Sequence, residues 1–194
     1  MKKVKIALAA LTIAAFAFDG CKKGDGDPFL SLASRKARIT GDWTVTKGEG
    51  TKTSTVSSVS STTTVTYDGT TETDVTGSFT STDKYTEKWS IEKDGTFTYT
   101  YTDNNGSSPD VTTYKGTWNW TGGVGDNKKK AQVVFYIESI TDSNGTTTYT
   151  GSNRSTVVYD IYELKGKEMI FYDKGDQSTT GSSSTSDIKW TLTQ

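Results

Sequence analysis

Hydrophobic and polar residues alternate along most of the chain beyond residue 40, with the period of two that is typical of half-buried β-strands. Each alternating run places aromatic or branched side chains on one face and mostly polar side chains on the other. Short clusters such as Asp94-Gly95 and Lys165-Gly166 separate the runs and predict turns. The predicted strands lie around residues 43–45, 65–67, 85–91, 97–101, 114–120, 133–137, 157–161, 169–171 and 188–192.

Two Ser/Thr-rich segments interrupt this pattern. Residues 51–66 read either as a low-complexity loop or as a long, solvent-facing hairpin. The Asp68-Gly69 pair favours the hairpin, because Asp-Gly supplies the positive φ of a type I′ turn. We expect residues 48–60 to be poorly ordered, and we interpret residues 175–186 as a loop.

One helix is predicted, over residues 28–38. Asp27 can cap it, Pro28 suits its first position, and three basic residues lie near its end. The strands that follow are joined by short connections without helices, so they are antiparallel neighbours. Eight to ten such strands close most simply into an up-and-down β-barrel, which removes exposed edges. We therefore predict an all-β chain with one barrel domain over residues 28–194, and a β-sandwich as the alternative.

The first residues predict export. Three lysines precede an apolar run over residues 6–18, which is shorter than the roughly 20 residues that span a bilayer. This pattern indicates a secretion signal over residues 1–20. The segment Phe18-Asp19-Gly20-Cys21 resembles the lipobox of bacterial lipoproteins, which implies a lipid on Cys21 and a polar tether over residues 21–27. The alternative is ordinary cleavage after Ala15-Phe16-Ala17, which leaves Cys21 as a free thiol.

Charge and composition exclude several kinds of function. Three of the 22 basic and one of the 23 acidic residues lie in the signal, so 19 basic and 22 acidic residues remain. This balance argues against a nucleic-acid partner, which requires a basic face. The sequence contains no histidine, which excludes Ser-His-Asp and Cys-His catalysis and histidine metal sites.

The remaining acidic residues do not define a catalytic or metal site. We interpret the Asp/Asn/Gly clusters at 103–106 and 142–145 as turns, because neither has the full spacing of a calcium loop. We predict that the protein is not an enzyme and uses no metal or cofactor. We also interpret the four acids on predicted strands as solvent-facing, namely Glu87, Glu138, Asp160 and Glu163.

The aromatic residues are the strongest candidates for function. A barrel of about eight strands can either fill its interior with side chains or hold one small ligand. The sequence favours a filled interior, and alternation alone does not say which face points inward. If a small apolar ligand binds, the candidate residues for contacting it are Trp89, Tyr99, Trp118, Phe135 and Trp190.

Several motifs together resemble the lipocalin-like lipoproteins of the Bacteroidetes group. Gly41-Asp42-Trp43 after a short helix resembles the Gly-x-Trp motif of lipocalins. The other matching segments, in chain order, are Cys21-Lys22-Lys23-Gly24, Asp27-Pro28-Phe29-Leu30-Ser31-Leu32, Ser34-Arg35-Lys36-Ala37-Arg38, Asp94-Gly95-Thr96-Phe97, Gly116-Thr117-Trp118 and Trp190-Thr191-Leu192. The resemblance implies a small antiparallel barrel on a lipid-anchored tether, and it implies no particular activity.

These observations lead to two functional expectations. The first is a monomeric lipoprotein of the cell envelope, anchored to the outer membrane on its periplasmic or surface side, whose barrel binds a small apolar molecule. The alternative is a cell-surface interaction or structural lipoprotein without a small-molecule ligand, which the two Ser/Thr-rich segments favour.

Overall fold

The computed structural model describes residues 35–122, 131–179 and 182–194. The predicted signal, Cys21, the tether and most of the predicted helix 28–38 lie outside the described residues. The described end of that helix is α2 (Arg35–Ile39), and a short 3-10 helix, η3 (Gly151–Asn153), is the other helical element among them. The strands are β1 (Gly41–Val56), β2 (Val59–Tyr67), β3 (Thr71–Thr76), β4 (Phe79–Ile91), β5 (Thr96–Asp103), β6 (Asp110–Gly122), β7 (Ala131–Asp142), β8 (Gly145–Thr148), β9 (Ser155–Leu164), β10 (Glu168–Thr179) and β11 (Ser182–Thr193).

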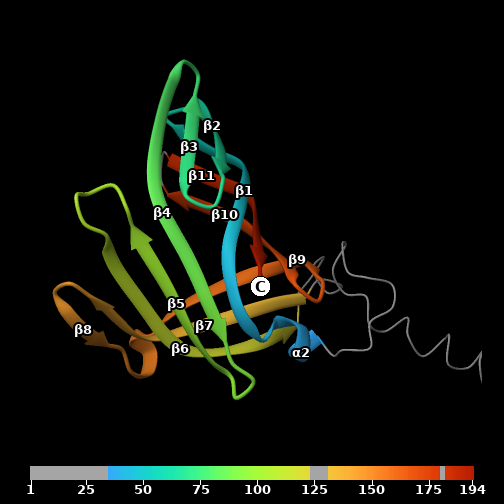
Figure 1. The fold of residues 1–194 in the computed structure, drawn as a ribbon. Helices are drawn as coiled ribbons and strands as arrows, with labels where there is room; N and C mark the ends of the chain where they lie inside the picture. The colour runs from blue at the N-terminus through green and yellow to red at the C-terminus, as the bar shows by residue number, and fades with distance from the viewer. Residues whose placement is uncertain (1–34, 123–130, 180–181) are drawn as a thin grey trace, which may run out of the picture.

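The strands form a closed antiparallel barrel (Figure 1). Hydrogen-bonded neighbours run from β6 back through β5, β4, β3, β2 and β1 to β11, β10, β9 and β7, and β7 pairs with β6 again. This circuit contains ten strands, while β8 pairs only with the end of β7. The predicted all-β barrel is confirmed, and the closed circuit rules out the alternative sandwich.

The barrel is narrower at one end than at the other. Residues 41–44 of β1 pair directly with residues 88–91 of β4, so the circuit there has eight strands. We call this region the closed end. Further along, β2 and β3 insert between β1 and β4 and continue beyond the barrel (Figure 1). We call the six-stranded extension the projecting sheet; it consists of β3 and of residues 51–56 of β1, 59–64 of β2, 79–84 of β4, 174–179 of β10 and 182–187 of β11.

The projecting sheet corrects two predictions. Residues 48–60, which we expected to be poorly ordered, form paired strands of the β1–β2 hairpin and the two-residue turn at 57–58. Most of the predicted loop 175–186 is instead the β10–β11 hairpin, paired from Glu168 and Thr193 up to Thr179 and Ser182. Hydroxyl side chains face one another across these strands, for example Thr55 and Ser60 at 2.8 Å between oxygens. Such cross-strand pairs, together with the high β-propensity of threonine, favour strand pairing even where the sheet has no apolar face.

Apolar side chains fill the closed end. Trp43 is 1 % exposed, and its indole nitrogen donates a hydrogen bond to the carbonyl of Ile39 at 2.8 Å. This bond joins β1 to α2 at the floor of the barrel. The guanidinium of Arg38 also donates to the carbonyl of Leu164, so the helix is held to β9. The other buried residues of this cluster include Ile91, Phe97, Trp118, Ile161, Leu164, Met169 and Leu192.

Candidate functional site

A cavity of about 190 Å³ lies in the barrel interior, between the closed end and the projecting sheet. Strand alternation turns every second residue of β4, β5, β9, β10 and β11 toward it. Aromatic side chains make up most of its wall, and two carboxylates complete it. The lining residues are Val45, Glu87, Trp89, Tyr99, Tyr159, Phe171, Asp173, Trp190 and Leu192.

Two local features of β1 shape this wall. A bulge between Val45 and Lys47 shifts its register against β11, so that Val45 and then Gly48 face the interior. Gly48 lies opposite Trp190, and a Cβ at Gly48 would lie 2.3 Å from the indole ring. The glycine therefore gives the Trp190 side chain the space to lie across β1.

A second cavity of about 220 Å³ adjoins the first and is more apolar. Trp89, Tyr99 and Tyr159 line both cavities, so these three side chains stand between them. The ring centres of Trp89 and Tyr99 are 4.4 Å apart, and Tyr159 stacks on Phe171 at 4.9 Å. The remaining walls of the second cavity are Phe97, Tyr114, Phe135, Ile137 and Val157.

The first cavity is acidic. Burial raises the pKa of Glu87 to about 7, while a hydrogen bond from the Tyr99 hydroxyl partly offsets that rise and nearby Glu72 adds to it. Burial also raises the pKa of Asp173, and the ammonium of Lys52 partly offsets this rise. Within the described ranges, neither carboxylate lies within 4.0 Å of a lysine or arginine nitrogen.

A lysine and two further carboxylates lie above the cavity, at the base of the projecting sheet. The Lys52 nitrogen is 3.2 Å from a Glu72 oxygen and 3.7 Å from an Asp74 oxygen. The Tyr85 hydroxyl donates to the other oxygen of Glu72. Lys52 therefore pairs with the upper two acids, and its effect on Asp173 is that of a more distant charge.

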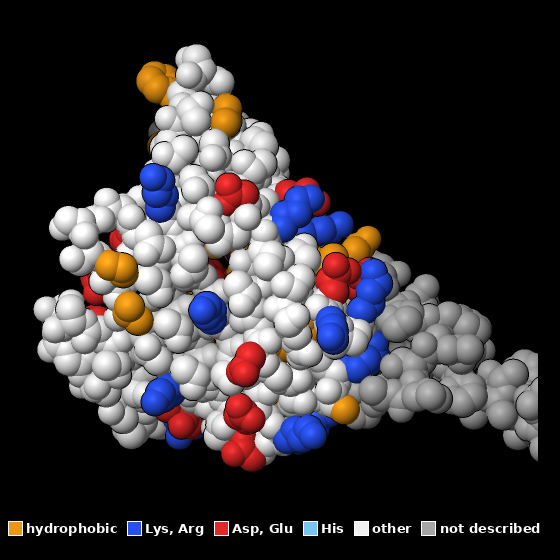
Figure 2. Space-filling view, in the orientation of Figure 1, with side chains coloured by type: hydrophobic (Ala, Val, Ile, Leu, Met, Phe, Trp, Pro, Cys, Tyr) orange, Lys and Arg blue, Asp and Glu red, His pale blue; other side chains and the backbone are white. Residues whose placement is uncertain are grey.

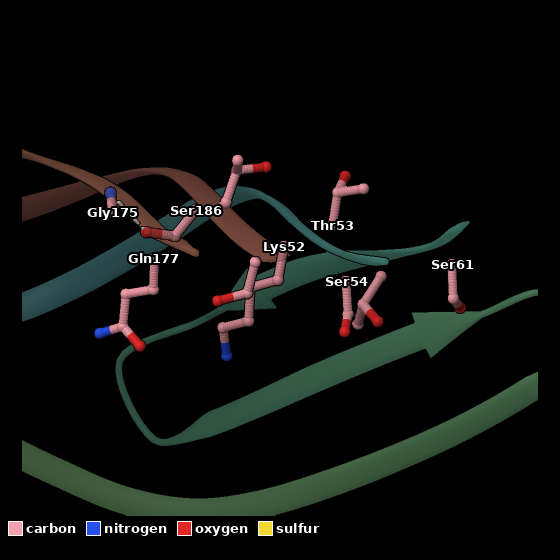
Figure 3. Close-up of a pocket in the computed structure, with 10 residues that line it drawn as sticks. Lys52, Thr53, Ser54, Ser61, Gly175, Gln177 and Ser186 are labelled. Carbon is pink, nitrogen blue, oxygen red and sulfur yellow. Dashed lines mark hydrogen bonds between the residues drawn. The ribbon is translucent and has the colours of Figure 1, made fainter. Parts of the chain in front are cut away.

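A polar groove of about 290 Å³ continues from this network along the projecting sheet (Figure 3). Lys52, Ser54 and Gln177 extend to one side of the strands, while Thr53 extends to the other. The hydroxyl of Ser186 accepts a hydrogen bond from the backbone of Gly175 at 2.7 Å. The interior face thus changes from apolar at the closed end to acidic and aromatic in the middle, and to amides and hydroxyls at the top.

Four of the five aromatic residues predicted for ligand contact line the two cavities. Trp89 and Tyr99 line both, Trp190 lines the first and Phe135 the second. Trp118 lines neither cavity; it is 2 % exposed, and its indole donates to the carbonyl of Glu92 at 2.9 Å. The interior is therefore filled at the closed end and hollow in the middle, which combines the two alternatives left by the sequence.

The predicted solvent-facing acids have different environments. Glu87 was wrongly assigned to the solvent, because it faces the interior beside Trp89. The prediction that Glu163 faces the solvent was also wrong, because this residue is largely buried. One of its carboxylate oxygens lies 2.6 Å from the Lys165 nitrogen. Glu138 pairs with Arg154 at 3.2 Å, and the amide of Gln132 donates to Asp160 at 2.7 Å.

The two Asp/Asn/Gly clusters make local turn contacts. Asp103 and Asp142 each accept a hydrogen bond at 2.7 Å from a backbone amide two residues further on. Among the described residues, no group of three or more acidic, cysteine or histidine side chains is arranged to hold a metal ion.

Neither Asp173, which lines the first cavity, nor Lys52, which is exposed above it, was predicted from the sequence. Asp173 continues the inward-facing alternation of Met169 and Phe171 on β10. From the sequence we ended this strand at residue 171, because we interpreted residues 175–186 as a loop. Lys52 lies in the segment expected to be poorly ordered, and the β1 bulge sets its face. Tracing the alternation beyond Phe171 would have found Asp173, whereas a bulge leaves no comparable signal.

Comparison of the chain with protein-family models, with curated proteins and with solved structures finds no match. In the part of the chain that the structure describes, no helix is long and apolar enough to cross a membrane.

Proposed function

We propose that this protein is a membrane-anchored binding module whose barrel takes up a small molecule with an aromatic or apolar body. The observation that carries the proposal is the pair of adjoining interior cavities walled by Trp89, Tyr99 and Tyr159. Binding sites are typically concave, largely apolar and supplied with a few polar groups that set orientation. Each cavity is smaller than the roughly 300–1,000 Å³ of a typical ligand pocket, so a ligand of ordinary size would need both. The side chains of Trp89, Tyr99 and Tyr159, which stand between the cavities, would turn aside to admit it.

The position of the cavities supports binding rather than simple packing. A close-packed interior has few voids larger than a water molecule. Here the buried side chains of the closed end form one cluster, while the middle of the same barrel contains two partly open cavities that share three aromatic walls. The polar groove of the projecting sheet begins two residues beyond Asp173 on β10, which gives a ligand a route toward the first cavity.

A ligand screen tests this function. The protein is purified from a bacterial host in the form the host produces, examined for co-purifying molecules by native mass spectrometry, and titrated with small aromatic compounds and fatty acids while Trp fluorescence is followed. We expect saturable quenching, because Trp89 and Trp190 line the cavity. Tyr159→Ala removes a wall of both cavities and should weaken binding about tenfold, equal to the loss of about 1.4 kcal/mol.

Tyr162→Ala is the matched control on the same strand. Tyr162 packs edge-on against Tyr172, away from the cavities, so this variant should bind as the unmodified protein does. No co-purifying molecule and no quenching across the screen would contradict the proposal. That result would favour the alternative, an interaction or structural role for the projecting sheet.

The membrane anchor is a separate part of the proposal and rests on the sequence of residues 1–21. A lipid on Cys21 and a tether over residues 21–27 would hold the barrel at the outer membrane of the cell envelope. Cys21→Ala should move the protein from the membrane fraction to the soluble fraction, or leave it as an unprocessed precursor of higher mass. Cys21→Ala protein that stays in the membrane with its leader removed would contradict lipidation. Lys22→Ala, next to the cysteine, should leave the fractionation unchanged.

A further inference from the structure

The acidic wall of the first cavity restricts the charge of the ligand, an inference that rests on the proposed binding function. We infer that the barrel binds a small organic cation, with an amine held by Glu87 and Asp173 and an aromatic or apolar body extending into the second cavity. The sequence alone pointed to an apolar ligand, and the two interior carboxylates are the reason for the change.

The charge balance of the cavity is the first support. Buried carboxylates in proteins are normally paired, because an isolated buried charge is costly. Glu87 and Asp173 both line the first cavity, and no described Lys or Arg nitrogen lies within 4.0 Å of either. Lys52, whose charge acts on Asp173 from a distance, is paired with Glu72 and Asp74 above them. A bound ammonium would supply the countercharge that the described residues do not.

The aromatic walls are the second support. The negative face of an aromatic ring attracts a cation, and aromatic cages are a common means of binding ammonium groups. Five aromatic side chains surround the carboxylates of the first cavity, namely Trp89, Tyr99, Tyr159, Phe171 and Trp190. The phenol groups of Tyr99 and Tyr159 stay neutral, because burial and the charge of Glu87 raise the pKa of both. They therefore add dipoles and ring faces to the site, and no competing charge.

The second cavity is the third support, because it defines the other half of the ligand. Among the described residues, its lining contains apolar and aromatic side chains and no carboxylate, amine or guanidinium. It meets the first cavity at Trp89, Tyr99 and Tyr159, so a ligand that spans both has one charged end and one apolar end. A fatty acid would place its own carboxylate beside Glu87 or Asp173, where like charges repel.

Three probes of similar size test the charge of the ligand: 2-phenylethylamine, 3-phenylpropionate and 2-phenylethanol. Isothermal titration calorimetry at pH 8 should show the amine binding at least about tenfold more tightly than the other two, since one desolvated charge pair readily supplies such a factor. Glu87→Gln and Asp173→Asn should each reduce the affinity for the amine several-fold and leave that for the alcohol within about twofold. Asp187→Asn, on the outer face beside Tyr172, is the matched control and should change neither.

The outcomes separate this inference from the function on which it rests. Equal or tighter binding of the propionate or the alcohol would overturn the cationic ligand and keep the binding function. Amine binding that survives both substitutions would also overturn the inference, because the carboxylates would then play no part. Absence of binding for all three probes overturns the inference; if the wider screen of aromatic compounds and fatty acids is also negative, the proposed function fails with it.

Discussion

The closed end and the projecting sheet share four strands, β1, β4, β10 and β11, yet only the closed end has an apolar interior. Along β1 the inward face begins with Trp43 and Val45 and ends with Lys52 and Ser54. Along β11 it begins at the opposite end with Leu192 and Trp190 and continues to Ser186 and other serines. Apart from the β1 bulge between Val45 and Lys47, the backbone pairing continues through this change.

This comparison indicates that strand pairing and barrel closure depend on different interactions. Ser and Thr strands pair in the projecting sheet through backbone hydrogen bonds and hydroxyl contacts, and the sheet there stays open. Closure occurs where bulky inward side chains from opposite walls can contact each other, as Trp89 contacts Phe135 and Phe171 across the interior. Figure 2 shows the projecting end with few charged side chains and only isolated hydrophobic ones, so its surface offers no second core on the face in view.

Truncation of an aromatic side chain should lower the free energy of unfolding far more in the closed end than in the projecting sheet, and this is the largest expected difference between the two regions. Trp43→Ala removes a fully buried indole and its hydrogen bond to Ile39, so the free energy of unfolding should fall by roughly 3–5 kcal/mol. Phe79→Ala, in the projecting sheet, removes a side chain that is 80 % exposed and should change the free energy of unfolding by less than about 0.5 kcal/mol. Chemical denaturation followed by circular dichroism measures both, and similar losses in the two variants would contradict the comparison.

The next largest effect should come from Glu87, at the boundary between the two regions. Its pKa is about 7 in the folded chain and close to 4.5 when unfolded, so the folded state binds the proton more tightly. The contribution of this group to stability is therefore fully present below about pH 4.5 and is lost as the pH rises to about 7. Glu87→Gln should remove this loss and increase the free energy of unfolding at pH 8 by roughly 1–3 kcal/mol.

The pH dependence identifies the cause of that effect. Other groups also face this region, including Glu72, Tyr85, Tyr99, Tyr101 and Tyr159, so the comparison is between variant and unmodified protein at each pH. The difference in unfolding free energy should be small at pH 4 and reach its full size by pH 8. A constant difference, or a less stable variant at pH 8, would show that Glu87 is not a buried ionised carboxylate. If the variant is more stable but binds the amine less well, Glu87 is retained for binding at a cost in stability.

Alternation predicted the closed end well, and the reasons are local. Trp43, Trp89 and Phe97 stand at every second position among polar neighbours, and such a pattern has one natural structure, a strand with one face buried. The projecting sheet could not be predicted in this way, because Ser and Thr occupy both faces of residues 51–56 and 182–187. Its strands depend on neighbours that are distant in sequence; Thr53, for example, pairs with Thr62 on one side and with Thr185 on the other. Neither segment alone predicts that register.

The candidate site was predictable only in part for a related reason. Alternation puts Glu87 on the same face as Trp89, but we assigned its side chain to the solvent, where acidic residues usually lie. A cavity resolves the conflict, since it lets an inward carboxylate keep part of its hydration while aromatic rings surround it. Cavities arise from the way several strands pack together, so no single segment of the sequence predicts one.

The smallest predicted effect locates the boundary between the two regions within one strand, β2. Thr63→Ala removes a half-buried hydroxyl that lies 2.5 Å from that of Thr76, and it should lower the free energy of unfolding by less than about 1 kcal/mol. Val65→Ala, two residues further along on the same face, removes a side chain with 0 % exposure and should cost roughly 1–3 kcal/mol. Chemical denaturation compares the two. A cost at Thr63 equal to that at Val65 would mean that the packed region extends into the projecting sheet, and the division between a closed end that carries the stability and a sheet that only pairs would then be wrong.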